Sequence, residues 1–185
     1  EAEARALIHC GALDRFHPTA HRAALLWQLC AWRKTGGRQT GEPGLFADPD
    51  PPAMPELPPE ESGQRLRREF AVLGFLCDRH PITLFADNLK GAGIIKARDI
   101  TSCVGRRVRL AGWLITGKTV ITKKGDPMEF VTFEDETGLV ETTFFPEAYH
   151  RFCHMLDHGR PFLLSGKVEA NWHAATLAVD AVRPI

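Results

Sequence analysis

The sequence predicts an α+β chain, in which a helical N-terminal segment precedes a five-stranded β-barrel with one helix between its third and fourth strands. The first observation behind this prediction is that residues 107–145 are rich in β-branched and aromatic side chains. Two turns divide this stretch into three strands. Residues 123–127 combine charged side chains with Gly and Pro, and residues 135–138 end in a glycine that suits a short hairpin connection.

The second observation is the order of the elements that follow. Pro146 begins a short helical pattern, and residues 161–169 and 175–182 return to a strand-like composition. Three strands, a helix and two strands are the element order of an OB-fold, a five-stranded Greek-key barrel that often binds oligonucleotides. We therefore expect residues 105–185 to form an OB-fold nucleic-acid-binding domain.

The chain before the barrel begins with helical patterns. Residues 1–10 consist largely of good helix formers, and residues 20–34 place Leu25, Leu29 and Trp32 on one face. Aromatic residues at helical spacing usually serve packing, so we expect a pair of helices that packs a small core. This predicts a helical segment over residues 1–35.

Residues 36–59 differ sharply in composition, because glycines are followed by a cluster of prolines. Such a segment is typical of a linker. Leu45 and Phe46 interrupt it as an adjacent apolar pair, which either anchors the linker locally or inserts into a partner's pocket. Residues 60–104 return to a helical pattern with turns and are predicted to connect the linker to the barrel.

Basic and aromatic side chains accompany the predicted strands of the barrel. They suit a groove that follows a phosphate backbone and stacks bases, although every barrel also needs an aromatic core and a charged exterior. Side-chain alternation does not settle which of these residues face outwards, because a strand bulge shifts it. The candidate nucleic-acid contacts are Arg107, Arg109, Lys118, Lys123, Lys124, Phe130, Thr132 and Phe133.

Composition limits the classes of function. The formal net charge is zero, which excludes the strongly basic character of an autonomous DNA-binding protein and leaves room for a local basic patch. The five cysteines are scattered and predict a reduced, cytoplasmic compartment, and no apolar run is long enough for a membrane span. The chain starts with Glu1 in a helical pattern, so we expect it to be part of a longer protein.

A histidine-rich stretch offers an alternative function. His150, Cys153, His154 and His158 have spacings that would place zinc ligands on one face of the helix after Pro146. This would make the chain a metal-dependent enzyme. The competing interpretation is an amphipathic cover for the barrel, which needs no metal, and we predict no metal site.

Several motifs resemble the C-terminal part of the bacterial DNA polymerase III alpha subunit, and the resemblance extends over essentially the whole chain. Upstream of the barrel, residues 7–14 and 21–26 resemble the end of that family's helix-hairpin-helix region, and Leu73-Gly74-Phe75-Leu76 resembles a later helix ending. Five landmarks of its OB domain follow in order: Ala111-Gly112-Trp113, Thr122-Lys123-Lys124-Gly125, Phe130-Val131-Thr132, Glu134-Asp135-Glu136-Thr137-Gly138 and Phe145-Pro146-Glu147.

The resemblance implies a DNA-directed DNA polymerase as the parent protein, with single-stranded or primed DNA as the partner of this part. The parent's palm domain would hold Mg²⁺ for nucleotidyl transfer, whereas this fragment is expected to carry no catalytic residues and no cofactor. The family's linker carries a motif for the sliding clamp. Leu45 and Phe46 match it, but Glu42 stands where glutamine is expected.

The resemblance also makes other replisome subunits expected partners. The remaining alternative is a free-standing OB-fold module that binds nucleic acid, including RNA or tRNA. An acidic turn that ends in glycine, like residues 134–138, also occurs in the anticodon-binding domains of tRNA synthetases.

Overall fold

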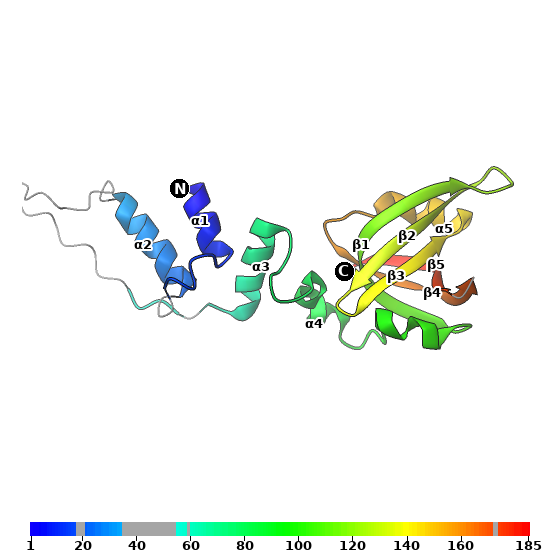
Figure 1. The fold of residues 1–185 in the computed structure, drawn as a ribbon, viewed down its shortest axis with the longest axis horizontal. Helices are drawn as coiled ribbons and strands as arrows, with labels where there is room; N and C mark the ends of the chain where they lie inside the picture. Colours follow the sequence, from blue (N-terminus) through cyan, green and yellow to red (C-terminus); the bar gives the residue numbers. More distant parts are fainter. Residues whose placement is uncertain (18–20, 35–54, 59, 172–173) are drawn as a thin grey trace, which may run out of the picture. The chain divides into compact units, whose positions relative to one another are not determined.

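The computed structural model describes residues 1–17, 21–34, 55–58, 60–171 and 174–185, so the Leu45–Phe46 pair lies outside the described residues. The chain divides into two compact units, Glu1–Cys77 and Asp78–Ile185 (Figure 1). The boundary between the two units falls within the stretch that connects the linker to the barrel. Among the described residues, no helix has the length and apolar character needed to cross a membrane.

The first unit contains the helices α1 (Ala2–His9), α2 (Arg22–Lys34) and α3 (Ser62–Leu73). Arg22 is buried where they meet. Its Nε and Nη2 donate to the Asp14 carboxylate at 3.1 and 2.7 Å, and its Nη1 donates to the backbone oxygen of His9 at 2.9 Å. Glu69 of α3 lies 3.8 Å from Arg22 and accepts a hydrogen bond from the Cys77 amide. Because the buried guanidinium is paired and hydrogen-bonded, it connects all three helices at a tolerable desolvation cost.

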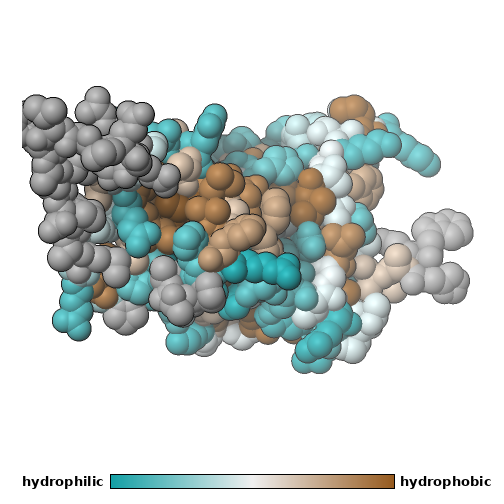
Figure 2. All heavy atoms as spheres, turned by 60° about the vertical axis from the view of Figure 1, so that its left-hand side comes forward, coloured by the Kyte–Doolittle hydropathy of each residue, from teal (hydrophilic) through white to brown (hydrophobic). Residues whose placement is uncertain are grey.

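The predicted apolar face of α2 is only partly buried. Leu25 is 5% exposed and Trp32 is 56% exposed, so the expectation that both pack in the core is wrong for Trp32. Trp32 lies in the last turn of α2. Figure 2 shows hydrophobic side chains, in brown, exposed at the surface among hydrophilic ones.

The second unit begins with short helical turns: η1 (Pro81–Phe85), α4 (Ala86–Leu89) and η2 (Ala97–Cys103). The sequence predicted a helical pattern with turns over residues 60–104, but not the bounds of η2. Its Ala97, Ile100 and Cys103 are nevertheless buried against the barrel core. A seven-residue 3₁₀ segment has too few turns for a clear periodicity, which explains why its bounds were not predicted.

The barrel follows as β1 (Arg107–Ile121), β2 (Pro127–Asp135), β3 (Gly138–Phe144), α5 (Pro146–Phe152), η3 (Cys153–Met155), β4 (Pro161–Asn171) and β5 (Ala174–Pro184). The strands close in the order β1-β2-β3-β5-β4, with β3 and β5 parallel and the other pairs antiparallel. The α+β class, the five strands and the helix between the third and fourth strands are confirmed.

The first strand is long because it serves two sides of the barrel. Its N-terminal half pairs with β4 and its C-terminal half with β2, and the register shifts between Leu114 and Thr116. Gly112 lies where β1 packs closely against Phe133. A Cβ at this position would come within 2.8 Å of the Phe133 Cβ, so only glycine allows this approach.

The barrel interior is filled by side chains that alternate along each strand. The largest fully buried ones include Phe133, Phe144, Phe162, Leu164 and Leu177. Helix α5 and η2 lie on different sides of the barrel, and both contribute to its core (Figure 1). The interior is therefore packed, and any ligand must bind to the outside of the barrel.

Candidate nucleic-acid interface

The two aromatic candidates on β2 lie on opposite sides of the strand. Val131 and Phe133 are fully buried, whereas Phe130 is 43% exposed and Thr132 is partly exposed. Alternation along a strand explains this division, since successive side chains point to opposite faces. Phe130 and Thr132 therefore face away from the barrel interior.

Phe133 belongs to the core and not to a binding surface. Its ring packs edge-to-face against Phe162 at a centroid distance of 6.4 Å, and both rings have no exposed surface. A buried ring has no free face for a base, so the expectation that Phe133 stacks is corrected here. Phe130 and Phe133 are three residues apart, and a regular strand cannot present both on one face.

Neighbouring strands place polar side chains beside Phe130. Lys118 of β1 is directly opposite Phe130, and Thr116 is opposite Thr132. Glu141 of β3 is opposite Thr132 and accepts a hydrogen bond from its Oγ1 at 2.9 Å. Directly opposed residues share a face of the sheet. We call the side chains of Thr116, Lys118, Phe130, Thr132 and Glu141 the outer β2–β3 face.

The β1–β2 hairpin carries two more lysines at the C-terminal end of β1, the half that also contains Lys118. Figure 1 shows this hairpin extending beyond the barrel. Thr122 and Asp126 close the loop, because the Thr122 amide donates to the Asp126 oxygen at 2.8 Å and the Asp126 amide donates to the Thr122 Oγ1 at 3.1 Å. Lys123 and Lys124 are exposed at its tip. The loop therefore presents two cations from a hydrogen-bonded turn.

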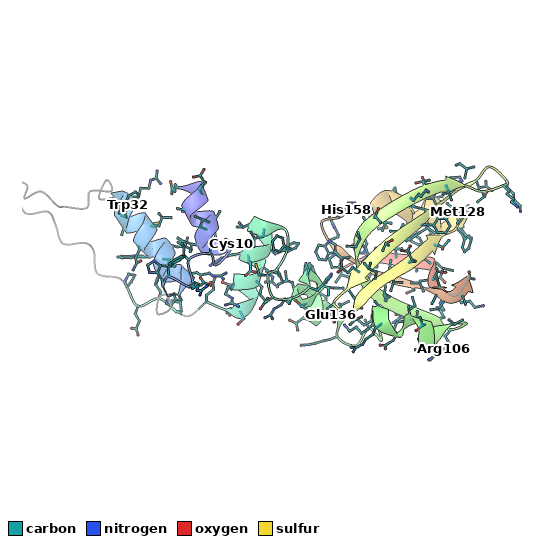
Figure 3. The ribbon with its side chains drawn as sticks, viewed as in Figure 1. Cys10, Trp32, Arg106, Met128, Glu136 and His158 are labelled. Carbon is teal, nitrogen blue, oxygen red and sulfur yellow. The ribbon has the colours of Figure 1, made fainter. Side chains whose placement is uncertain are left out.

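The arginines at the start of β1 lie elsewhere on the barrel. Arg107 and Arg109 pair with β4, whereas Lys118 pairs with β2. Arg107 binds the Asp180 carboxylate, with an Nη2–Oδ1 distance of 2.6 Å, and Arg109 donates to the Ala92 oxygen at 3.2 Å. Figure 3 likewise shows Arg106 far from Met128, which follows the hairpin. The structure thus divides the basic candidates into two groups.

The acidic turn between β2 and β3 has a structural role that the sequence did not reveal. Asp135 is 4% exposed. Its carboxylate accepts hydrogen bonds from the Ala97 amide at 2.8 Å and from the Thr137 amide and hydroxyl at 2.7 and 2.6 Å. Asp135 therefore connects η2 to the β2–β3 turn through hydrogen bonds. The neighbouring Glu136 forms an ion pair with Lys96.

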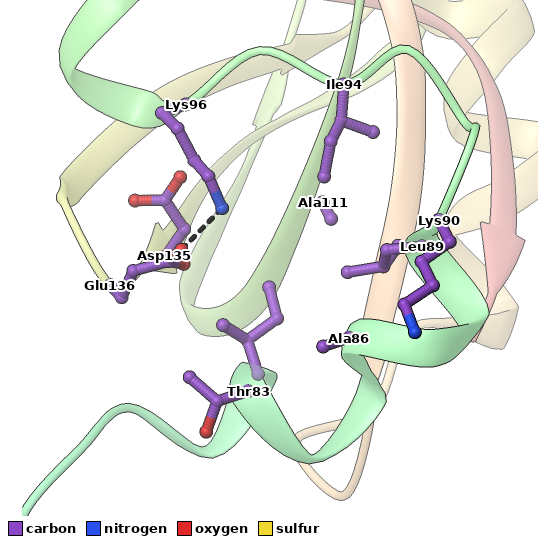
Figure 4. A pocket seen from close by; sticks show the side chains of 10 residues that line it. Thr83, Ala86, Leu89, Lys90, Ile94, Lys96, Ala111, Asp135 and Glu136 are labelled. Atoms are coloured by element: carbon purple, nitrogen blue, oxygen red, sulfur yellow. Dashed lines mark hydrogen bonds and ion pairs between the residues drawn. The ribbon is translucent and has the colours of Figure 1, made fainter.

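These acidic residues also line a small cavity in the second unit. It has a volume of about 260 Å³ and lies between η1, α4 and the start of the barrel. Figure 4 shows the Lys96–Glu136 pair beside it. Lys90, the other lysine at this cavity, pairs with Asp87 at 2.7 Å. Both cations are therefore already paired.

Among the described residues, the spacing that would suit zinc ligands does not produce a cluster. Helix α5 ends at Phe152, and His158 lies beyond η3 with its Nδ1 3.2 Å from the Leu114 oxygen. Burial, and then the neighbouring Glu129, raise the pKa of the Cys153 thiol. A protonated thiol is a poor metal ligand. Within the described ranges, no three His, Cys, Asp or Glu residues are grouped to hold a metal.

Comparisons with known proteins show which proteins and which domain family the chain is similar to. Residues 108–185 match the family model described as an OB-fold nucleic acid binding domain. An error-prone DNA polymerase of Anaeromyxobacter sp. (strain K) is 33% identical over 183 residues, covering 97% of this chain. The DNA polymerase III subunit alpha of Bacillus subtilis (strain 168) is 30% identical over 170 residues, or 89% of the chain, and that of Thermus aquaticus is 30% identical over 189 residues, or 93%.

The chain spans 15% of the length of each of these three relatives. The similarity includes the helices of the first unit as well as the barrel, because it covers nearly the whole chain. The chain is therefore homologous to the C-terminal region of bacterial DNA polymerase III alpha subunits and error-prone DNA polymerases, and it carries an OB-fold nucleic acid binding domain.

Proposed function

We propose that the barrel binds single-stranded template DNA in a bacterial replicative DNA polymerase. The observation that carries this proposal is the outer β2–β3 face, where the half-exposed Phe130 lies opposite Lys118. An exposed ring beside cations can stack a base while the cations contact phosphate. The β2–β3 face and the β1–β2 loop are also the surfaces that OB-folds commonly use for oligonucleotides.

We assign no catalytic step to this chain. Polymerase chemistry needs carboxylates that are free to hold two Mg²⁺ ions. Asp135 is not free in this sense, since its carboxylate is buried and accepts three hydrogen bonds. Glu136 is paired with Lys96. Nucleotidyl transfer is therefore proposed for the palm domain of the parent protein.

The main alternative is an OB-fold module that binds RNA. The description of the matching family names nucleic acid in general, so it fits this alternative equally well. A protein distinguishes RNA from DNA by contacts to the 2′-hydroxyl. Binding of DNA and RNA oligonucleotides of the same sequence would separate the two functions, and clearly tighter binding of RNA would favour the alternative.

Replacing Lys118, Lys123 and Lys124 with alanine is expected to weaken binding by removing phosphate contacts. Each single-strand contact contributes about 0.7 to the slope of log affinity against log salt, so the triple variant should lose about two units. Fluorescence anisotropy of a labelled single strand across a salt series measures this slope.

A matched variant controls for the loss of three charges. Arg15, Arg65 and Arg67 are exposed in the first unit, and their replacement with alanine should leave the slope unchanged. An unchanged slope in the triple-lysine variant would place the DNA path elsewhere or give this barrel a protein partner.

We also propose that Leu45 and Phe46 contact the sliding clamp. These residues lie outside the described part of the chain, so the proposal rests on their match to the family's motif. Replacing both with alanine should abolish binding to purified clamp while leaving the melting temperature of the barrel unchanged. A lower melting temperature would instead identify the pair as a structural anchor.

A further inference from the structure

A second basic surface lies on the β1–β4 side of the barrel. Arg107 of β1 is directly opposite Lys167 of β4, and Arg109 is directly opposite Ser165. Opposed residues share a face, so these four side chains point to the same side of the sheet. We call this surface the β1–β4 basic cleft: Arg107, Arg109 and Ser165 line its hollow, and Lys167 lies beside them on the same face. It is separate from the outer β2–β3 face, which uses the other half of β1.

The surface is hollowed where the two arginines lie. A cleft of about 390 Å³ is lined by Arg107, Arg109, Ser165 and small neighbours, namely Ala92, Gly93, Val108 and Ala181. Arg107, Arg109 and Lys167 are all exposed. The Arg109 guanidinium is held in position, because one of its nitrogens donates to the Ala92 oxygen at 3.2 Å. Its other N–H groups can serve a ligand.

The charges of this surface are not balanced. Arg107 and Lys167 face each other directly, and like charges in this position destabilise a sheet. Asp180 offsets part of this repulsion by its ion pair with Arg107. Ser165 is directly opposite Arg109, and Ala178 is opposite Lys167 on its other side, so among the described residues no carboxylate lies directly across from either cation. An anion in the cleft would relieve the repulsion.

The lining indicates which anion fits. The cleft has no aromatic side chain among its lining residues, so it offers no platform on which a base can stack. Guanidinium groups bind phosphate oxygens through paired hydrogen bonds, and a serine hydroxyl can donate to the same group. This combination suits the phosphates of a nucleic-acid strand and leaves the bases uncontacted.

We propose that the β1–β4 basic cleft is a second phosphate-backbone site, which holds a nucleic-acid strand beyond its contact with the outer β2–β3 face. This inference rests on the proposed function, since it assumes that the chain binds single-stranded DNA. Arg109 and Lys118 are nine positions apart on β1, which corresponds to at most about 30 Å of strand. An oligonucleotide of about 16 nucleotides, the upper end of the site size of one OB-fold, is the appropriate probe.

Two variants test this site from opposite directions. Replacing Arg109 and Lys167 with alanine removes two phosphate contacts, so the salt slope should flatten by about 1.4, at about 0.7 for each contact. Asp180→Asn keeps the side-chain shape but releases Arg107, so the slope should steepen by about 0.7 and affinity at low salt should rise. A merely structural role for Asp180 does not predict tighter binding.

The measurement is fluorescence anisotropy of the full chain with this single strand across a salt series. Arg65 and Arg67 of the first unit provide the matched control, whose double alanine variant should retain the slope of the unmodified chain. The proposal is overturned if the Arg109/Lys167 variant behaves like this control and Asp180→Asn binds no more tightly. In that case the cleft faces a protein or solvent.

The outcomes separate this proposal from the proposed function. If only the triple-lysine variant flattens the slope, the hairpin binds DNA and the second site is rejected. If only the Arg109/Lys167 variant flattens it, the strand follows the β1–β4 side and the hairpin assignment fails. If both flatten it, a single strand contacts both surfaces.

Discussion

Replacing Phe133 with alanine is expected to destabilise the barrel by about 3–5 kcal/mol, the usual cost of removing a buried aromatic ring. The side chain is fully buried and packs edge-to-face against Phe162. Its removal leaves a cavity beside Gly112, which has no side chain of its own to fill it. The loss is a large fraction of the roughly 5–15 kcal/mol that stabilises a typical domain.

Urea unfolding, followed through the amide NMR signals of the barrel strands, measures this effect in the barrel alone. Phe130→Ala is the matched control, because the same side-chain truncation at the half-exposed ring should cost less than about 1 kcal/mol. Equal destabilisation by the two variants would mean that Phe130 is also a core residue, and the outer β2–β3 face would lose its stacking group.

Replacing Asp135 with alanine is expected to destabilise the second unit by about 2–3 kcal/mol, since hydrogen bonds to a charged group contribute about 1.5–3 kcal/mol and their loss leaves a buried donor unpaired. The affected donor is the Ala97 amide, which is buried with η2 against the barrel. Asp135→Asn should cost less, because its amide oxygen can still accept one of these hydrogen bonds.

The adjacent Glu136 serves as the control for this prediction. Its ion pair with Lys96 is partly exposed, so Glu136→Ala should change stability by less than about 1 kcal/mol. Thermal melting of the three variants provides the comparison. If Asp135→Ala melts like Glu136→Ala, the carboxylate does not hold η2 in place, and a role for Asp135 in ligand binding would have to be reconsidered.

The fold was predictable because the local signals agree with one another. Turn residues at 123–127 and 135–138 delimit the strands, and Pro146 begins the helix that the structure shows as α5. The 3₁₀ helix η2 was not predictable in the same way. Its position depends on contacts that are distant in sequence, above all the hydrogen bond between the Ala97 amide and Asp135.

The candidate site was predictable in its residue types but not in its arrangement. Composition indicates that arginines, lysines and phenylalanines accompany the strands, but it does not show which strand pairs with each half of β1. That pairing separates Arg107 and Arg109 from Lys118. Alternation could have shown that Phe130 and Phe133 face opposite sides, whereas only the closed barrel shows that Phe133 is the inner one.

The most informative measurement is the binding of a labelled single-stranded DNA to the unmodified chain and to Phe130→Ala, by fluorescence anisotropy across a salt series. If the outer β2–β3 face binds DNA, the variant should lose about 1–3 kcal/mol of binding free energy, the range found for one stacked base, with little change in the salt slope. Equal affinities of the two proteins for the single strand would contradict a binding surface centred on Phe130.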